Sequence, residues 1–552
     1  MLTVLVDPPP RGSAAKRSAS TATAGPQAEA GRADATPAKT APAKTTPDQA
    51  APDQAAPDQA APGHAAPLPP KLAEPPITGG KVEEFMGRVI KVLAHSPLAR
   101  PLPAVTLSGL GLAGVAFTGL CATAPTPSIA TPPVLLPLTD LAHRAGAPHL
   151  SNDVSNTIMY VSIGLCCLGL AMMLWANSHL GWSPKPRKVF AVAAGVIAVL
   201  VNISPVGSGD VASYAAYGRL TALGFNPYAV GPGRLPGGSP CTPANCNPYT
   251  AIVNPMWRGA PSNYGPIATG EQWLAALIGG NRPWLTIWVL MIMAAIAFLA
   301  TGYVLMRTAE NPVRAALMWV ANPLLIVELV MGGHLDGLLA LVAIAAIVLS
   351  RRARTARDDI VVGLLVGLAG GIKITAGFVA LGIAIPLLHN REWVRLLRTV
   401  AAAGVTTGAL YYLTWGFGAL KPLGQASKLI ISPTIWRLLV VWCQQINPSS
   451  VHMVTTIVGL AWYPLMLLLA WYLYNRLSPD VPTVVAATCA LTFAWAIAAT
   501  WSLPWYTAIA WVSLALLPRN SLTRWLTLAT GLLAIAHFNG GWFTPTTPGP
   551  TP

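Results

Sequence analysis

The chain has 552 residues, of which 53% are hydrophobic and only 10% are charged. Soluble domains carry about 25% charged residues, so this composition excludes an ordinary soluble protein and predicts an all-α polytopic membrane protein. The net charge of +15 does not indicate a nucleic-acid partner, because Lys and Arg of membrane proteins gather in cytoplasmic loops.

Residues 1–80 form a low-complexity tail rich in Ala, Pro, Thr and Lys, in which a five-residue repeat starts at Thr46. Regular Pro and the lack of an apolar face predict a disordered cytoplasmic tail, and residues 541–552 are expected to form a second disordered tail. Basic and apolar residues interleave at helical spacing from Lys81 onward, which predicts an amphipathic interfacial helix over 81–100.

Residues 101–540 are expected to form one transmembrane domain of about thirteen helices. A crossing requires about 20 residues, and several apolar runs are shorter, so one pair could instead be re-entrant. The expected spans are 103–122, 157–177, 187–204, 283–306, 313–331, 337–350, 359–372, 374–389, 399–418, 452–474, 482–500, 505–518 and 523–538.

Every second loop between these spans is basic, as in the run Arg351-Arg-Ala-Arg354. Basic loops face the cytoplasm, so the N-terminus is predicted inside and the C-terminus outside the cell membrane. The loop 205–282 then lies outside. It is rich in Gly, Pro, Asn, Tyr and Trp, and loops of this length usually have a function.

Asp210 opens a polar stretch in this outer loop. Tyr214 and Tyr217 follow at helical spacing on the same face, with Arg219 nearby, so a short helix would direct these groups at one spot. A carboxylate at the membrane surface is a candidate acid or base, but an Asp at a helix start can equally be an N-cap. The spacing alone leaves both readings open.

Further along the loop, Asn226-Pro-Tyr228 and Tyr264-Gly-Pro266 hold amide and aromatic groups in turns, which suits sugar binding as well as ordinary loop packing. Glu271 is a second carboxylate on the same side. In the same loop, Cys241 and Cys246 are close enough in sequence for a disulfide bond in an oxidising compartment, and a zinc site is less favoured.

Three charged or titratable residues are expected at the outer ends of later spans. His334 and Asp336 lie in a short outer turn, where they could bind a phosphate or, more weakly, a metal. Lys373 lies between two apolar runs, where it either meets a lipid phosphate or snorkels to the interface. Glu328 lies within a span, and a membrane-embedded carboxylate is by default a functional candidate.

Trp505 and Tyr506 close another outer turn and are candidates for interfacial anchoring or acceptor-sugar stacking. The chain has no Gly-rich phosphate loop of the nucleotide type, so the donor is not expected to be a soluble nucleotide sugar.

The motifs around Asp210, Asn226, Tyr264, His334 and Lys373 together resemble the GT-C superfamily of polytopic glycosyltransferases. More closely, they resemble the actinobacterial polyprenol-phosphomannose-dependent α-1,6-mannosyltransferases of lipomannan synthesis, with the MptB branch favoured over the MptA branch. The resemblance covers roughly residues 100–540, and the two spans before the Asp210 loop are taken as an N-terminal addition.

The resemblance implies that Asp210 is the catalytic base of an inverting transfer of mannose from a polyprenyl phosphate to a lipoglycan α-1,6-mannan. Lys373, His334 and Arg219 would stabilise the leaving phosphate, and the aromatic and amide groups would bind sugar. The chain has no Asp-x-Asp pair of the kind associated with metal in this superfamily, so no cofactor is expected, and a divalent metal is possible but not favoured.

Two other functions remain open at this point. A transporter would need broken helices around a midplane site and usually an internal repeat, and no repeat is visible among the spans. A GT-C enzyme using another lipid-linked sugar, such as polyprenyl-phosphate arabinose, has the same sequence features.

Overall fold

The computed structural model describes Arg88, Val92 and residues 100–121, 134–237, 246–426, 429–431, 434–477 and 481–538. The expected disordered tails and most of the expected interfacial helix at 81–100 lie outside these residues. The described helices fall within one compact unit, Glu74–Pro545.

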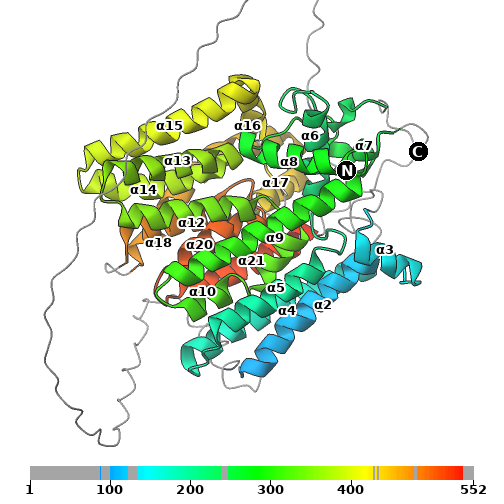
Figure 1. The fold of residues 1–552 in the computed structure, drawn as a ribbon, viewed down its shortest axis with the longest axis horizontal. Coiled ribbons are helices and arrows are strands. Elements are labelled where there is room, and N and C mark those ends of the chain that lie inside the picture. The colour runs from blue at the N-terminus through cyan, green and yellow to red at the C-terminus, as the bar shows by residue number, and fades with distance from the viewer. Residues whose placement is uncertain are drawn as a thin grey trace, which may run out of the picture. The chain divides into compact units, whose positions relative to one another are not determined.

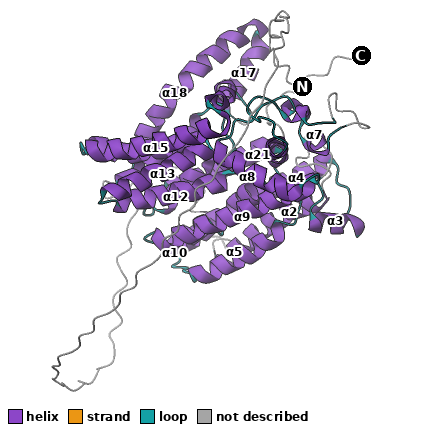
Figure 2. Ribbon diagram, turned by 45° about the horizontal axis from the view of Figure 1, so that its top comes forward, coloured by secondary structure: helices purple, strands orange, loops and turns teal. Residues whose placement is uncertain are grey.

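Within the described residues every regular element is helical (Figure 2), as the composition predicts. Four helical segments are long and apolar enough to cross a membrane: α2 (Pro101–Cys121), α4 (Asn152–His179), α9 (Pro283–Thr308) and Pro448–Asn475, which contains α18 (Val451–Asn475). A fifth is possible if the bent pair Pro312–Met318 and Pro323–Met331 counts as one span. Helices also occupy the other predicted spans, but several are too short for this test, and thirteen crossings are not confirmed.

The remaining elements complete the helical order of the unit. They are α3 (Pro137–Arg144), α5 (Pro186–Leu200), α6 (Asp210–Ala222), η2 (Pro232–Arg234), α7 (Pro248–Ile252), η3 (Pro255–Trp257), α8 (Pro266–Gly279), α10 (Pro312–Met318), α11 (Pro323–Leu325), η4 (Ile326–Met331), α12 (Asp336–Arg352), α13 (Ala356–Ile372), η5 (Ile374–Ala376), α14 (Gly377–His389), α15 (Trp393–Trp415), η6 (Phe417–Leu420), α16 (Lys421–Ala426), α17 (Ile435–Ile446), η7 (Pro448–Ser450), α19 (Thr483–Ala498), η8 (Pro504–Thr507), α20 (Ala508–Ala515) and α21 (Leu522–Phe538).

Small residues bring the long helices together in pairs. Helix α2 packs along α4, and α13 packs along α15 (Figure 1). A Cβ added at Gly111 of α2 would lie 2.5 Å from Cys166 Sγ of α4, and one added at Gly363 of α13 would collide with the Thr399 carbonyl of α15. Close backbone approach through glycine is the usual way in which helices associate in a membrane, where the hydrophobic effect does not drive them together.

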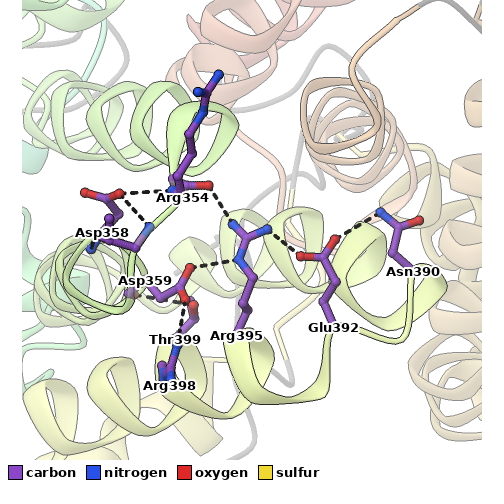
Figure 3. Close-up of polar contacts among 10 residues, drawn as sticks. Arg354, Asp358, Asp359, Asn390, Glu392, Arg395, Arg398 and Thr399 are labelled. Atoms are coloured by element: carbon purple, nitrogen blue, oxygen red, sulfur yellow. Dashed lines mark hydrogen bonds and ion pairs between the residues drawn. The ribbon is translucent and has the colours of Figure 1, made fainter.

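The two ends of α13 carry different polar groups. Near its first turn, Asp359 is buried and accepts from Arg395 Nε at 3.0 Å, with Arg398 3.7 Å away (Figure 3). The Arg395–Asp359 pair ties the starts of α13 and α15 together, and Arg395 also pairs with Glu392 at the start of its own helix. Lys373 follows the last residue of α13. Asp359 and Lys373 are fourteen residues apart in the chain. At about 1.5 Å per residue this separates the two polar clusters by about 21 Å along the helix, about two thirds of the thickness of a bilayer core.

Candidate active site

Asp210 is the first residue of α6 and directs its carboxylate into the site rather than capping the helix. The N-cap is Gly209, which makes no side-chain cap, and the Asp210 amide donates to Ser208 Oγ at 3.1 Å. The Asp210 carboxylate instead accepts a long hydrogen bond from the Tyr214 hydroxyl, with 3.4 Å between the oxygens. The i, i+4 spacing predicted this pairing, and the N-cap alternative is wrong.

The second wall of the site is the turn after the bent pair of helices. Residues 326–331 form a π-helix, a rare element that often marks functional sites, and the Val206 amide donates to the Met331 carbonyl at 3.2 Å. Gly333 follows at φ +65°, and a Cβ there would lie 2.9 Å from Val211 of α6. Only glycine fits this conformation and this close approach, so the turn presses His334 against α6.

His334 lies between Asp210 and the aromatic residues of the C-terminal turn. Its Nδ1 is 3.4 Å from the Tyr214 hydroxyl and 3.9 Å from Asp210 Oδ2. Its ring stacks on Trp505, with 3.6 Å between the ring centroids. Trp505 also contacts His537 edge-on, with 5.0 Å between the ring centroids. The sequence analysis missed His537, because nothing but its residue type distinguishes it in an apolar helix.

Lys373 is buried in this site and pairs with Asp336. Its Nζ donates to both carboxylate oxygens, at 3.0 and 2.9 Å, and lies 3.7 Å from the ring centroid of Tyr506. Only 6% of the residue is exposed. The snorkelling alternative is therefore wrong, and the sequence analysis did not foresee that Asp336 is the partner of this ammonium group.

Tyr264 joins the site because two glycines allow the backbones of two segments to touch. The Gly265 amide donates to the Ile372 carbonyl at 2.9 Å, and a Cβ on Gly265 would collide with the Gly371 carbonyl. Tyr264 then packs edge-on against Tyr214, with ring centroids 4.9 Å apart. This contact places Tyr264 next to Asp210 and beside the segment that carries Lys373.

Tyr217 and Arg219 were expected to act together with Asp210, but their side chains form hydrogen bonds with other parts of the chain. Tyr217 donates its hydroxyl to the Ala260 carbonyl at 3.0 Å and so fastens the outer loop to α6. Arg219 donates to Asn281 and lies 5.9 Å from the centre of the Tyr249 ring. Nine residues at 100° each place Arg219 on the opposite side of the helix from Asp210, so it is not the expected partner of a phosphate there.

The remaining loop residues make local contacts. Asn226 Oδ1 accepts from the Tyr228 amide at 2.9 Å, and the buried Tyr228 hydroxyl is 2.8 Å from Thr269 Oγ1. Glu271 has one carboxylate oxygen that is buried without a partner, and burial raises its pKa to about 7. Among the described residues, no hydrogen bond or ring contact joins these three side chains to Asp210 or Lys373.

The charge of His334 differs from the expectation that this side chain would stabilise the leaving phosphate. Burial, with Lys373 and His537 nearby, lowers the pKa of His334 well below its usual value, so this ring is neutral at pH 7 and supplies no positive charge to a phosphate. The Asp210 side chain is 34% exposed, yet desolvation of the carboxyl raises its pKa to about 6. Lys373 and the Tyr214 hydrogen bond act in the opposite direction and limit this rise.

The described residues show no metal-binding cluster and include one disulfide-bonded cysteine of the outer loop. Within the part of the chain that the structure describes, no group of three or more His, Cys, Asp or Glu side chains is placed to hold a metal ion. Cys246 is disulfide-bonded, while Cys241 lies outside the described residues.

Comparisons with known proteins agree with the resemblance found in the sequence. A family model described as "Alpha-(1->6)-mannopyranosyltransferase, N-terminal domain" matches residues 109–390, just over half of the chain. The match begins inside α2, so the first spans belong to the family domain and are not an N-terminal addition. No solved structure matches the chain significantly.

Characterised relatives carry the same description. The chain is 23% identical over 401 residues to alpha-(1->6)-mannopyranosyltransferase A of Corynebacterium glutamicum, which covers 65% of this chain and 78% of the relative. It is 26% identical over 286 residues to the B enzyme of the same organism, covering 47% and 46%. The A enzyme of Mycobacterium tuberculosis is 27% identical over 252 residues, 44% of each chain. The chain is a glycosyltransferase that belongs to the MptA/MptB family of alpha-(1->6)-mannopyranosyltransferases.

Proposed function

We propose that this membrane mannosyltransferase moves mannose from a polyprenyl-phosphate donor to the 6-hydroxyl of an α-1,6-mannan acceptor of a lipoglycan, with Asp210 as the general base. The observation that carries the proposal is a carboxylate with a raised pKa that interacts electrostatically with the buried Lys373–Asp336 pair. The names of the relatives support a mannosyl donor and an α-1,6 acceptor. Both A and B enzymes are similar to this chain, so the proposal does not choose between them.

In the proposed reaction Asp210 accepts the proton of the acceptor hydroxyl as its oxygen attacks the anomeric carbon of mannose. The bond from that carbon to the phosphate oxygen breaks, and the lipid phosphate leaves with the bonding electrons. A β-linked donor then gives an α product by inversion. Lys373 is the described cation best placed to meet the phosphate, because Asp336 and the Tyr506 ring hold its ammonium in place.

Two observations support an extracytoplasmic site in a cell-membrane protein. Disulfide bonds persist outside the cytoplasm, and Cys246 in the loop 205–282 is disulfide-bonded. Arg395 and Arg398 lie near the first turn of α13, where they pair with Asp359 (Figure 3). Lys373 follows the last residue of this helix, as the positive-inside rule requires if Lys373 faces outward.

The rate of transfer is expected to rise with pH through about 6 and then to level off. A base must be deprotonated, and the folded-state pKa of Asp210 is about 6, so kcat/KM should fall about tenfold per pH unit below that value. Tyr214→Phe removes a hydrogen bond that stabilises the carboxylate and should shift the inflection upward. A profile with no inflection between pH 5 and 7.5, measured with the purified enzyme, would count against Asp210 as base.

The donor is tested by supplying purified enzyme with radiolabelled polyprenyl-phosphate mannose or polyprenyl-phosphate arabinose and an octyl α-1,6-dimannoside. We expect incorporation of mannose alone, with an α-1,6 linkage that an α-1,6-specific mannosidase removes. Transfer of arabinose instead would assign the chain to the other donor. Movement of intact lipid-linked sugar across a vesicle membrane without transfer would indicate a transporter.

A further inference from the structure

Two tryptophans from different loops face each other beside the site. Trp257 ends η3 in the outer loop, and Trp501 precedes η8 in the C-terminal turn. Their ring centroids are 6.2 Å apart and their planes are inclined by 46°. Both side chains are half-buried, so part of each ring is accessible.

Both tryptophans are connected to the environment of Asp210 through short chains of contacts. The Ala260 amide donates to the Trp257 carbonyl at 3.1 Å, and the Ala260 carbonyl accepts from Tyr217, two turns beyond Asp210 on α6. Trp501 lies four residues before Trp505, which stacks on His334. Tyr217 lies about 10 Å along α6 from Asp210, and its contact with Ala260 leads from the helix to the segment of Trp257.

The other aromatic faces at the site are already covered. Trp505 is 1% exposed and stacks on His334, and the face of Tyr506 is covered by Lys373. In contrast, Trp257 and Trp501 are only half-buried. An accessible aromatic ring suits a pyranose, which offers an apolar ring face.

We infer that Trp257 and Trp501 form an acceptor platform, which binds the mannose unit next to the one that receives the new sugar. The inference rests on the proposed function and adds a subsite to it. The terminal mannose would lie at Asp210, and the penultimate ring would stack on the accessible faces of the two indoles. This arrangement makes a disaccharide a better acceptor than a monosaccharide.

The test compares KM for octyl α-1,6-dimannoside with KM for octyl α-mannoside, at a saturating concentration of the lipid donor. Trp257→Ala and Trp501→Ala should each raise KM for the dimannoside about tenfold, the effect of losing one ring-stacking contact, while kcat changes less than about twofold. KM for the monomannoside should stay unchanged, so that the preference for the disaccharide disappears. Trp257→Phe and Trp501→Phe should retain most of that preference.

Trp284→Ala is the matched control, because Trp284 is 38% exposed at the start of α9 and makes no ring contact with the site. It should leave both KM values unchanged. Saturation-transfer NMR with the dimannoside gives a readout that does not need turnover, and it can be recorded on Asp210→Asn protein. Unchanged dimannoside KM and unchanged saturation transfer in the folded Ala variants would overturn the platform. Retained transfer by Asp210→Asn would instead overturn the proposed base and leave the platform standing.

Discussion

Asp210→Asn is expected to lower kcat about 1,000-fold while leaving the binding of both substrates intact. The amide keeps the size of the side chain and can still accept from Tyr214, but it cannot take a proton from the acceptor hydroxyl. General-base catalysis contributes about 10²- to 10⁴-fold in enzymes, which sets the expected size of the loss. The measurement is single-turnover transfer from radiolabelled polyprenyl-phosphate mannose in detergent.

Asp140→Asn is the matched control for this substitution. Asp140 is a partly exposed carboxylate on α3, paired with Arg144 and outside the site, so its loss should leave kcat unchanged. A melting temperature equal to wild type would show that Asp210→Asn protein is folded. Turnover of that folded variant within tenfold of wild type would remove Asp210 from the proposed role.

Neutralising the Lys373–Asp336 pair is expected to separate its structural contribution from its part in the reaction. Lys373→Met or Asp336→Asn alone leaves one buried charge without its partner, which should lower stability by about 3 kcal/mol. The double variant Asp336→Asn/Lys373→Met removes both charges and should recover most of that stability. Its kcat should stay at least about 100-fold below wild type, because no ammonium meets the leaving phosphate.

The exposed pair Asp140–Arg144 provides the control for this cycle. These side chains are 39% and 76% exposed, so neutralising both should change stability by no more than about 1 kcal/mol and leave kcat unchanged. The measurements are thermal unfolding in detergent and single-turnover transfer. Recovery of wild-type kcat by the Asp336→Asn/Lys373→Met variant would show that Lys373 acts through the fold alone.

The sequence predicted the all-helical character of the chain, because apolar length depends on local composition, while the thirteen predicted crossings are not confirmed. It also predicted the contact between Asp210 and Tyr214, since a four-residue spacing on a helix is enough to bring two side chains together. The position of Arg219 on the far side of α6 from Asp210 follows from the same helical geometry. It could have been predicted, because the two residues are nine positions apart.

The pairing of Lys373 with Asp336 was beyond sequence reasoning, because 37 residues separate them and their contact depends on the packing of α12 and α13. The neutral state of His334 was equally hidden, since it arises from burial under Trp505, far along the chain. The π-helix over residues 326–331, which leads into the turn of His334, could not be predicted, because the apolar periodicity of the span does not distinguish it from an α-helix.

The aromatic side chains that cover His334 and Lys373 come from a part of the chain that is made later than the residues they cover. Asp210, His334, Asp336 and Lys373 all precede residue 390, where the family match ends, whereas Trp505 and Tyr506 follow more than a hundred residues later. During synthesis the helices enter the membrane in order. The Lys373 ammonium and the His334 imidazole therefore lack their contacts with Tyr506 and Trp505 until the segment that carries these aromatic residues has inserted. A nascent chain halted before η8 therefore holds every charged group of the catalytic centre but not the surface that shields them from lipid and water.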